Sequence, residues 1–546
     1  MPGRRGEERR RDGRVAMMRT GRALAFAAVL LVWNTWGYDL WAPDEPYFAE
    51  GAREMVADGE WAVPHVNGVV TTDKPPLFFW LIAAFSLPAG QVGSFTARLP
   101  SVLAMLAATA LTIRLARRLS GEAAGTVAGL VFVTTYLVWD KGRSAQIDAL
   151  LCLLILLALS AFEAFRAGDL PGRRAGLLFW AAAALATLAK GPVGFLVPLG
   201  IALVTLAVDR DARAWKRFAP LAGPAVFLGI VAAWMALATV GGHGTYSVWA
   251  AFKQHVLNRA LHGMHHKQPF WYYAQVLPVQ LVPWSGLVPA ALVLAWRRRG
   301  ADDRFLLVWA AFVVAFFSVP VEKRDLYVLP AYPAFAILVA RVVGAVDSGI
   351  REAPRRLATI SHAVVGALLT LAGVAVPFAA GRSGELSPAV AVVPAVALAA
   401  TGIASLVLAA RDRLRPAVLA TIAGTAATYL AIATTALPAL NPVMSARAFS
   451  ESLATKTAAS RAAGHDVLAY EVGNLPQAFA LYTRGLYTKE TSDPAVLERH
   501  FAQAEQVFAV ADERSLEQLQ ASTREHLVVL SRARLNGRSV VIAANR

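Results

Sequence analysis

Long apolar stretches recur along most of this chain and constrain its fold more than any other feature. Runs of roughly 16 to 24 apolar residues follow one another between Ala23 and Pro438, and each is long enough to cross a hydrocarbon core of about 30 Å as a helix. Of the 546 residues, 56% are hydrophobic. The one cysteine, Cys152, lies inside an apolar run, which excludes a disulfide framework and a thiolate metal site. The sequence therefore predicts a multi-span membrane protein.

The predicted architecture is an all-α polytopic membrane domain over residues 22–438, with about 13 transmembrane helices. The spans are expected near residues 22–40, 99–117, 124–139, 147–166, 175–189, 192–208, 220–240, 271–296, 305–320, 326–345, 359–380, 388–410 and 416–438. The apolar stretch 77–87 is shorter and is flanked by prolines. It is predicted to be a juxtamembrane or half-inserted helix rather than a full span.

The distribution of the positive charge predicts the orientation in the membrane. The net charge is +16, and arginines gather in alternate short loops, for example at 173–174 and 297–299. Cytoplasmic loops carry this excess in membrane proteins. Residues 1–21 are then a basic cytoplasmic N-terminus, and the first span is a retained signal anchor. The charge is explained without a nucleic-acid partner.

In this orientation, polar residues collect on the outer face. The first outside segment, 41–98, is long, and segments 241–270 and 321–325 are rich in histidine and in charge. After Pro438 the composition becomes polar, with short β-like runs at 467–470, 507–510, 527–530 and 540–543. Residues 443–546 are therefore predicted to form a small soluble α/β domain on the outer face.

Asp44 and Glu45 are the first candidate site residues and directly follow the first span. A carboxylate here is expected to be ionised at neutral pH and to act as a general base or to orient an acceptor. The run from Pro43 to Pro46 also suits the start of a helix. The sequence leaves both interpretations open.

Lysines on the same face are candidates for binding a phosphate. Lys74 follows Asp73 and precedes two prolines, while Lys323 and Tyr327 lie about one helical turn apart at the mouth of a predicted span. Each side chain suits either a phosphate contact or an anchor at the lipid surface.

Two further charges lie at the ends of predicted spans. Asp148 opens one span, where a carboxylate is costly unless it faces a cavity or finds a partner. Lys190 occupies a helix break, and a snorkelling lysine explains this position fully, while a functional role stays open as the second interpretation.

A divalent metal is the one cofactor that the residue pattern suggests. Five of the ten histidines fall in segment 241–270, and His255 and His266 join Asp73 as candidate ligands. Their spacing fits no closed zinc motif. The D-x-D run at 209–211 lies in a basic inside loop and is interpreted as chance, so no nucleotide site is predicted.

Several short motifs follow one another between residues 33 and 333. They are Asp44-Glu45, Gly59-Glu60-Trp61, Lys74-Pro75-Pro76-Leu77, Arg98-Leu99-Pro100, Ala189-Lys190-Gly191-Pro192, and Lys323 with Tyr327-Val328-Leu329-Pro330. In this order they resemble the bacterial branch of the GT-C glycosyltransferases, the protein-mannosyltransferase-like and aminoarabinose (lipid A) transferase group.

The resemblance implies an inverting glycosyltransferase in the bacterial cytoplasmic membrane, active on its outer face. The donor would be a sugar on a polyprenyl phosphate, and the acceptor an envelope lipid, glycan or protein. By this likeness Asp44 is the catalytic carboxylate, Asp148 is the second acidic residue, and Lys74 and Tyr327 contact the donor phosphate. Candidate residues beside these are Glu45 for catalysis and Lys323 and Arg53 for the phosphate. His255 and His266 also match family positions.

Two positions depart from the aminoarabinose transferases, which often have arginine where Tyr47 stands and glutamate where Asp73 stands. The sugar and the acceptor therefore stay open. The candidate residues lie on the outer face, where nucleotide sugars are not supplied. A transferase acting there needs a donor that is carried by the membrane itself. One alternative is a transporter or flippase for a lipid-linked sugar, although such proteins usually show repeats and broken mid-membrane helices. Another is a non-catalytic envelope scaffold with the C-terminal domain as its binding module.

Overall fold

The computed structural model describes residues 2–242, 267–519, 524–525 and 527–545, which form two compact units. The first unit comprises residues 1–35, 72–78 and 99–436, and the second comprises residues 36–71, 79–98 and 437–546. The first outside segment thus groups mostly with the C-terminal domain rather than with the helices that flank it in sequence.

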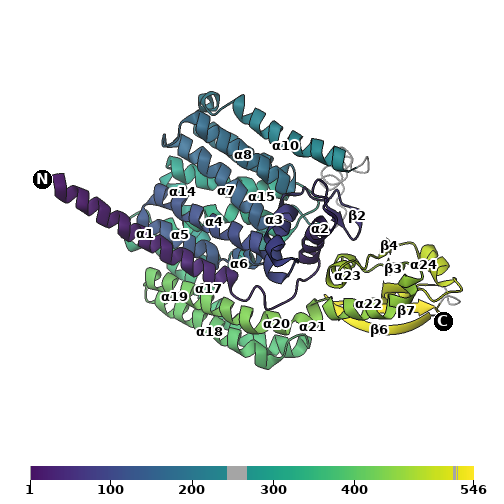
Figure 1. The fold of residues 1–546 in the computed structure, drawn as a ribbon. Helices are drawn as coiled ribbons and strands as arrows, with labels where there is room; N and C mark the ends of the chain where they lie inside the picture. Colours follow the sequence, from purple (N-terminus) through teal and green to yellow (C-terminus); the bar gives the residue numbers. More distant parts are fainter. Residues whose placement is uncertain (1, 243–266, 520–523, 526, 546) are drawn as a thin grey trace. The chain divides into compact units, whose positions relative to one another are not determined.

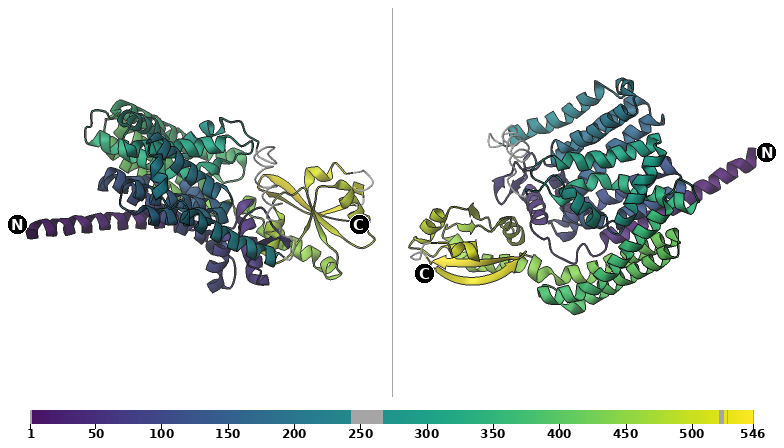
Figure 2. Two further views of the ribbon diagram at one scale, coloured as in Figure 1. Left: turned by 90° about the horizontal axis from the view of Figure 1, so that it is seen from above. Right: turned by 180° about the vertical axis from the view of Figure 1, so that it is seen from behind.

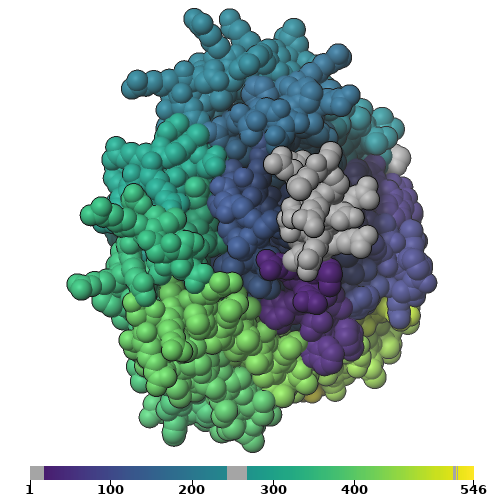
Figure 3. All heavy atoms as spheres, turned by 90° about the vertical axis from the view of Figure 1, so that its left-hand side faces the viewer, coloured from purple at the N-terminus to yellow at the C-terminus, as the bar shows by residue number. Residues whose placement is uncertain are grey.

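The first unit is built from helices (Figure 1). They are α1 (Pro2–Val32), α4 (Ser94–Ser120), α5 (Glu122–Thr134), α6 (Tyr136–Gly142), α7 (Ile147–Arg166), α8 (Gly172–Lys190), α9 (Val193–Val208), α10 (Ala222–Gly241), α13 (Tyr272–Gln280), α14 (Val288–Arg298), α15 (Ala301–Ser318), α16 (Tyr332–Asp347), α17 (Arg355–Ser383), α18 (Pro388–Ala410) and α19 (Leu414–Ala431). Each predicted span overlaps a helix or a bent pair of helices. Figure 3 shows the heavy atoms as spheres, with the left-hand side of Figure 1 facing the viewer.

Among the described residues, seven helices are long and apolar enough to cross a membrane, or up to nine if each bent pair counts as one span. The bent pairs are α5 with α6, at 67°, and α13 with the 285–298 segment, at 117°. The chain therefore has the fold of a polytopic membrane protein. The count of about 13 stays a prediction, because α9 and other helices are shorter or more polar than a full span requires.

The first predicted span is wrong at its C-terminal end. It was expected to reach residue 40, but α1 ends at Val32. Asn34 has a positive φ of 58°, a left-handed conformation that interrupts a helix. Its side-chain amide donates to the Ala433 carbonyl at 2.7 Å, so the break is held by a contact that no local pattern reveals.

Burial separates the inner helices of this unit from the outer ones. In α16 and the turn before it, 89% of the 18-residue apolar stretch is buried inside the protein, and in α7 the buried share is 72%. In α10, α17 and α18 the buried share is a third or less. Apolar side chains on these outer helices are available to lipid, whereas α7 and α16 form the interior that carries polar residues.

Glycines bring α17 and α18 into close contact. A Cβ at Gly373 would lie 2.6 Å from the Ala395 carbonyl oxygen, and one at Gly402 would collide with Thr370. Lipid tails are as apolar as leucine, so small residues that let two backbones approach are a main source of helix association in membranes.

The second unit contains α2 (Asp44–Asp58), the hairpin β1 (His65–Val66) and β2 (Val69–Val70), and most of α3 (Leu77–Ser86). The short α3 agrees with the juxtamembrane helix predicted at 77–87. The rest is a five-stranded sheet with helices. These elements are α22 (Arg447–Ala462), β3 (Val467–Tyr470), α23 (Pro476–Thr483), β4 (Lys489–Thr491), α24 (Pro494–Phe501), β5 (Phe508–Asp512), α25 (Glu513–Leu516), β6 (Leu527–Leu535) and β7 (Arg538–Asn545).

The sheet has the strand order β4-β3-β5-β7-β6. β3 is parallel to β4 and to β5, with Val467 opposite Phe508, whereas β7 is antiparallel to β5 and β6. Alternate residues of β3 enter two apolar cores, one with α22 and α23 and the other with α24. Helices therefore cover both faces of the sheet (Figure 2), and the predicted α/β domain is confirmed.

Candidate functional site

Asp148 and Lys190 form a buried ion pair in the helical unit. Asp148 lies in the first turn of α7 and is 2% exposed. Lys190 is the last residue of α8, and its Nζ lies 2.5 Å from Asp148 Oδ1. α7 and α8 pack together and are joined by a short loop, so the end of α8 returns to the start of α7. The structure thus provides the partner that the sequence required for Asp148.

Tyr327 and two further cations lie near Lys190. Lys190 Nζ lies 4.5 Å from the centre of the Tyr327 ring, a cation–π distance. The charges of Lys74 and Arg324 also act on the Lys190 ammonium group. Lys74, Lys190, Arg324 and Tyr327 come from three distant parts of the chain, and the fold brings them together.

Tyr327 lies in a 3-10 turn, Asp325–Ala331, whose position is fixed by polar contacts from α13. The Tyr273 hydroxyl donates to the Arg324 carbonyl at 2.9 Å, and Gln280 Nε2 donates to Asp325 Oδ2 at 3.1 Å. These bonds hold the turn that presents Tyr327 toward Lys190. A network of this kind favours a defined geometry rather than a mobile surface anchor.

Lys74 is bonded to its neighbour but remains partly exposed. Its Nζ donates to Asp73 Oδ2 at 2.7 Å, and the two side chains are 18% and 27% exposed. Pro75 and Pro76 follow and restrict the backbone after the lysine. An ammonium group held by a carboxylate and still reached by solvent is suited to contact an anionic ligand.

Only Asp73 of the three predicted metal ligands lies within the described residues. No group of three or more histidine, cysteine, aspartate or glutamate side chains placed to hold a metal occurs there. His255 and His266 lie outside the described residues. Asp73 is engaged with Lys74, and metal binding stays a prediction.

Lys323 has a different environment from the other lysines. It is 3% exposed, and its Nζ donates to the carbonyl oxygens of Gln268, at 2.9 Å, and Pro320, at 2.5 Å. Burial lowers the pKa of this ammonium group. Lys323 is also not one helical turn from Tyr327, because the helical turn begins only at Asp325. These contacts favour a structural role over a phosphate contact.

Asp44 and Glu45 begin α2 in the second unit, and their environments differ. Asp44 is partly exposed in the first turn. Glu45 is buried and receives two hydrogen bonds of 2.7 Å from Arg98 and one of 3.0 Å from the Trp41 amide. Because Glu45 is committed to these donors, Asp44 is the better candidate for catalysis.

Arg98 holds the segment before Asp44 as well as Glu45. It donates to the carbonyl oxygens of Tyr38, at 3.0 Å, and Asp39, at 2.7 Å. Its guanidinium group also stacks 3.7 Å from the centre of the Tyr38 ring. All of these partners are buried or nearly so, and such charge-assisted bonds are stronger than neutral ones.

Arg53 belongs to an acidic network on α2. It makes two hydrogen bonds of 2.7 Å to Glu50 and one of 3.1 Å to the Tyr487 hydroxyl. Glu54 accepts from the Gly68 amide at 3.1 Å. Burial and a hydrogen bond with Glu50 raise the pKa of Glu54 to about 8. Arg53 is therefore occupied by Glu50 in this structure, which favours a structural role.

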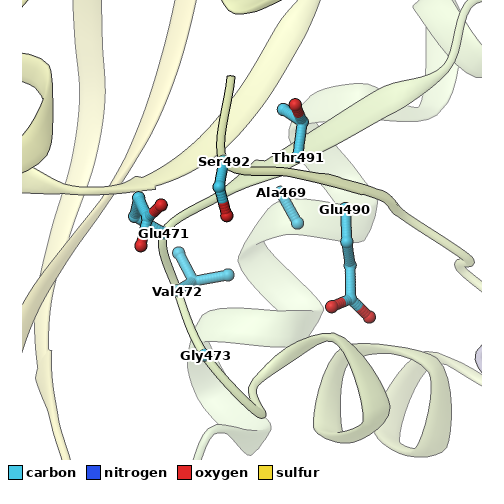
Figure 4. A pocket seen from close by; sticks show the side chains of 7 residues that line it. All are labelled: Ala469, Glu471, Val472, Gly473, Glu490, Thr491 and Ser492. Atoms are coloured by element: carbon cyan, nitrogen blue, oxygen red, sulfur yellow. The ribbon is translucent and has the colours of Figure 1, made fainter. Parts of the chain in front are cut away.

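A cavity of about 250 Å³ lies at the carboxyl ends of β3 and β4. Glu471, Glu490, Thr491 and Ser492 give it a polar lining (Figure 4). Its lining includes none of the predicted site residues, and it lies in the second unit.

Sequence reasoning undervalued Lys190, Arg324 and Arg98. A signal existed for Lys190, since the costly carboxylate of Asp148 needed a cation. Arg98 stands in the motif Arg98-Leu99-Pro100, but its partners, the Glu45 carboxylate and the carbonyl oxygens of Tyr38 and Asp39, lie more than 50 residues away in sequence. The D-x-D residue Asp209 is explained by ion pairs with Arg166 and Arg304 at 2.5 and 2.6 Å.

Comparison with known proteins places this geometry in a family context. Residues 73–236 match the family described as dolichyl-phosphate-mannose-protein mannosyltransferase. An undecaprenyl phosphate-alpha-4-amino-4-deoxy-L-arabinose arabinosyl transferase of Edwardsiella ictaluri is 34% identical over 309 residues, 56% of this chain and 55% of that protein. One with the same name from Pseudomonas aeruginosa is 31% identical over 312 residues, 56% of each chain. The chain thus spans about half the length of the curated relatives it matches.

Solved structures match over nearly the whole chain. The crystal structure of ArnT from Cupriavidus metallidurans bound to undecaprenyl phosphate has a TM-score of 0.75 and 22% identity, over 96% of this chain and 97% of that one. The resemblance predicted from the sequence is confirmed. The chain has the fold of ArnT, with a mostly helical membrane unit and a small C-terminal α/β domain. An oligosaccharyltransferase of Archaeoglobus fulgidus is more distant, with a TM-score of 0.53 and 12% identity over 90% of this chain and 69% of that one.

The family match covers part of the cluster. The matched segment, 73–236, contains Lys74, Asp148 and Lys190. Arg324 and Tyr327 lie outside this segment.

Proposed function

We propose that this chain is an inverting glycosyltransferase that moves a sugar from a polyprenyl-phosphate donor to an envelope acceptor. The observation that carries this proposal is the cluster of Lys74, Lys190, Arg324 and Tyr327 around Asp148. The relatives whose names specify an undecaprenyl-phosphate aminoarabinose donor support it. 4-Amino-4-deoxy-L-arabinose is accordingly the first donor sugar to test, with a lipid A-like lipid as acceptor.

The cluster has the charge that a lipid-linked phosphate needs. Lys74 pairs with Asp73 and Lys190 pairs with Asp148, and the charges of Lys74 and Arg324 act on Lys190. The carboxylates hold the two lysines in place before any ligand arrives, and the ammonium groups and the Tyr327 phenol suit a phosphate. The phosphate gains charge as the sugar leaves, so these groups bind the transition state more tightly than the donor.

In the proposed reaction, an acceptor oxygen attacks the anomeric carbon of the sugar. The bond between that carbon and the phosphate oxygen breaks, and the polyprenyl phosphate leaves as an anion. The configuration at the anomeric carbon is inverted. If the acceptor is a hydroxyl group, its proton passes to Asp44. If it is a phosphate, the nucleophile is already an anion and Asp44 orients it.

The energy of a single lysine–phosphate contact limits how much it can accelerate the reaction. At an effective dielectric constant near 20, a lysine about 4 Å from the phosphate contributes up to about 4 kcal/mol. This corresponds to at most about three decades in rate. The cluster therefore has to act together with orientation of the acceptor, which is the role proposed for Asp44.

We place this reaction on the outer face of the bacterial cytoplasmic membrane, with residues 1–21 in the cytoplasm and residues 443–546 outside. The arginine-rich loops support this orientation. The transferase domain comprises residues 22–438, with the segment 41–98 contributing Asp44.

The test is transfer by the purified full-length protein in vesicles. Undecaprenyl phosphate carrying aminoarabinose, and in parallel mannose, is supplied with a lipid A-like acceptor, and the released undecaprenyl phosphate and the glycosylated acceptor are both measured. Stoichiometric appearance of the two products supports the proposal. Movement of the donor between leaflets without release of undecaprenyl phosphate would identify a flippase and overturn it.

A further inference from the structure

The segment just before Asp44 lacks regular secondary structure but is held by side chains of the C-terminal domain. Residues 38–42 belong to no helix or strand. Their backbone groups therefore need partners outside a regular ladder. Within the second unit, residues beyond 437 supply most of them.

Tyr482, at the end of α23, makes two of these bonds. The Leu40 amide donates to the Tyr482 hydroxyl oxygen at 2.9 Å, and the Tyr482 hydroxyl donates to the Leu40 carbonyl at 2.7 Å. One phenol thus satisfies both polar groups of one residue, as a strand neighbour does in a sheet. Burial raises the pKa of Tyr482, so the hydroxyl keeps the proton that the second bond needs.

The residues on either side of Leu40 are held as well. Asn441 Oδ1 accepts from the Asp39 amide at 3.1 Å and from Trp41 Nε1 at 3.0 Å. Ser445 and Arg447 contact the Asp39 carboxylate at 2.7 and 2.8 Å.

The start of α2 is held by packing in addition to these bonds. α2 packs against α23, the helix that carries Tyr482. Ala42 packs against the apolar core of the C-terminal domain. Asp44 therefore follows an anchored segment and begins a helix that rests on the same domain.

We propose that Tyr482 is a positioning residue through which the C-terminal domain holds Asp44 in place for sugar transfer. This inference rests on the proposed function, because it assigns Asp44 a part in the reaction. It adds a role for the α/β domain, which contributes no residue to the cluster of Lys74, Lys190 and Tyr327.

Tyr482→Phe is the appropriate variant, because it keeps the ring in its packing and deletes both bonds to Leu40. We expect kcat to fall about 10- to 100-fold, the scale of a misplacement of up to about 1 Å. The KM for the donor should stay at the wild-type value. The thermal midpoint should fall modestly, because both backbone groups of the buried Leu40 lose their partner. Tyr470→Phe is the matched control, since Tyr470 lies on β3 of the same domain and is not among the residues that bond to 38–42.

A double-mutant cycle separates positioning from a general structural effect. If Tyr482 acts through Asp44, Tyr482→Phe should cause no further loss in single-turnover rate when Asp44 is already asparagine, because coupled residues are non-additive. Hydrogen exchange gives a second readout, in which the peptide containing Leu40 should lose protection in Tyr482→Phe and keep it in Tyr470→Phe. If Tyr482→Phe does not accumulate, Asn441→Leu removes the neighbouring bonds and should give the same pattern.

The outcomes are distinguishable. Transfer by the wild-type protein with an equally active Tyr482→Phe variant overturns the inference and leaves the proposed function intact. The same fractional loss in the wild-type and Asp44→Asn backgrounds also overturns it. Absence of transfer by the wild-type protein from any donor overturns the proposed function, and the positioning role falls with it.

Discussion

The acidic pair on α2 leads to a prediction about pH. Glu50 is fully buried and Glu54 is 1% exposed, and Arg53 of α2, the Gly68 amide of the hairpin and Tyr487 of the C-terminal domain surround them. The pKa of Glu54 rises from its ordinary value of 4.5 to about 8, mainly because burial disfavours the charged form and because Glu50 shares a hydrogen bond. Glu54 is therefore expected to keep its proton at pH 7 while the β1–β2 hairpin covers it.

The sign of the effect follows from the raised pKa. When the hairpin opens and exposes Glu54 to water, the carboxyl ionises near its ordinary value, while the closed form keeps its proton up to about pH 8. Between these values the open form binds fewer protons, so the closed form loses stability as the pH rises. Each pH unit between 4.5 and about 8 lowers the stability of the closed form by about 1.4 kcal/mol, so the total loss of stability is at most about 5 kcal/mol.

Hydrogen exchange measures this local opening. Peptides covering residues 61–71 are followed in wild-type protein at pH 6 and pH 9, with the intrinsic pH dependence of exchange removed. Protection should fall at pH 9 in the wild type and stay constant in Glu54→Gln, whose amide keeps a hydrogen bond to Glu50. Glu60→Gln, an exposed carboxyl in the same loop, should behave as wild type. Equal protection of the wild type at both values would refute the reasoning.

The remaining predictions concern the proposed site and the topology. Asp44→Asn should lower transfer by about 10²- to 10⁴-fold, and near wild-type turnover in the folded variant would exclude a catalytic role. Lys190→Met should destabilise the protein by about 3–5 kcal/mol by leaving Asp148 buried alone; adding Asp148→Asn should restore the thermal midpoint but not donor binding, and restored binding would place the phosphate elsewhere. Lys74→Ala should weaken both donor binding and single-turnover transfer. Tyr327→Phe should cost about 1 to 3 kcal/mol of transition-state stabilisation, because it deletes one hydrogen bond. Wild-type rates for both variants would assign the phosphate to other cations. A reporter that is active only in the cytoplasm should be inactive when fused after Arg546, and an active fusion would reverse the orientation.

Helix positions were largely predictable from hydropathy, whereas breaks were not. The span expected at 147–166 coincides with α7, because a long apolar run has no alternative to a helix in lipid. The bend at Thr135, between α5 and α6, has no proline or glycine to announce it. The end of α1 at Val32 likewise depends on Asn34 and its contact with Ala433.

The candidate site was predictable in its composition but not in its pairing. Asp148, Lys74 and Tyr327 were named from the sequence, and the structure gathers them through contacts between distant segments. The engagement of Glu45 by Arg98 and of Lys323 by backbone carbonyls could not be foreseen. Hydrogen bonds to backbone groups leave no signature in the identity of the accepting residue.

The grouping of residues 36–71 and 79–98 with residues 437–546 affects how this protein can be recombined with its relatives. The two ends of this unit recognise each other through specific pairs, such as Asn67 with Thr488 and Tyr482 with Leu40. A chimera that exchanges the α/β domain alone would join mismatched halves of these pairs, although every transmembrane helix remained native. Exchange of all three segments together keeps the pairs matched, so the functional module for recombination is discontinuous in sequence.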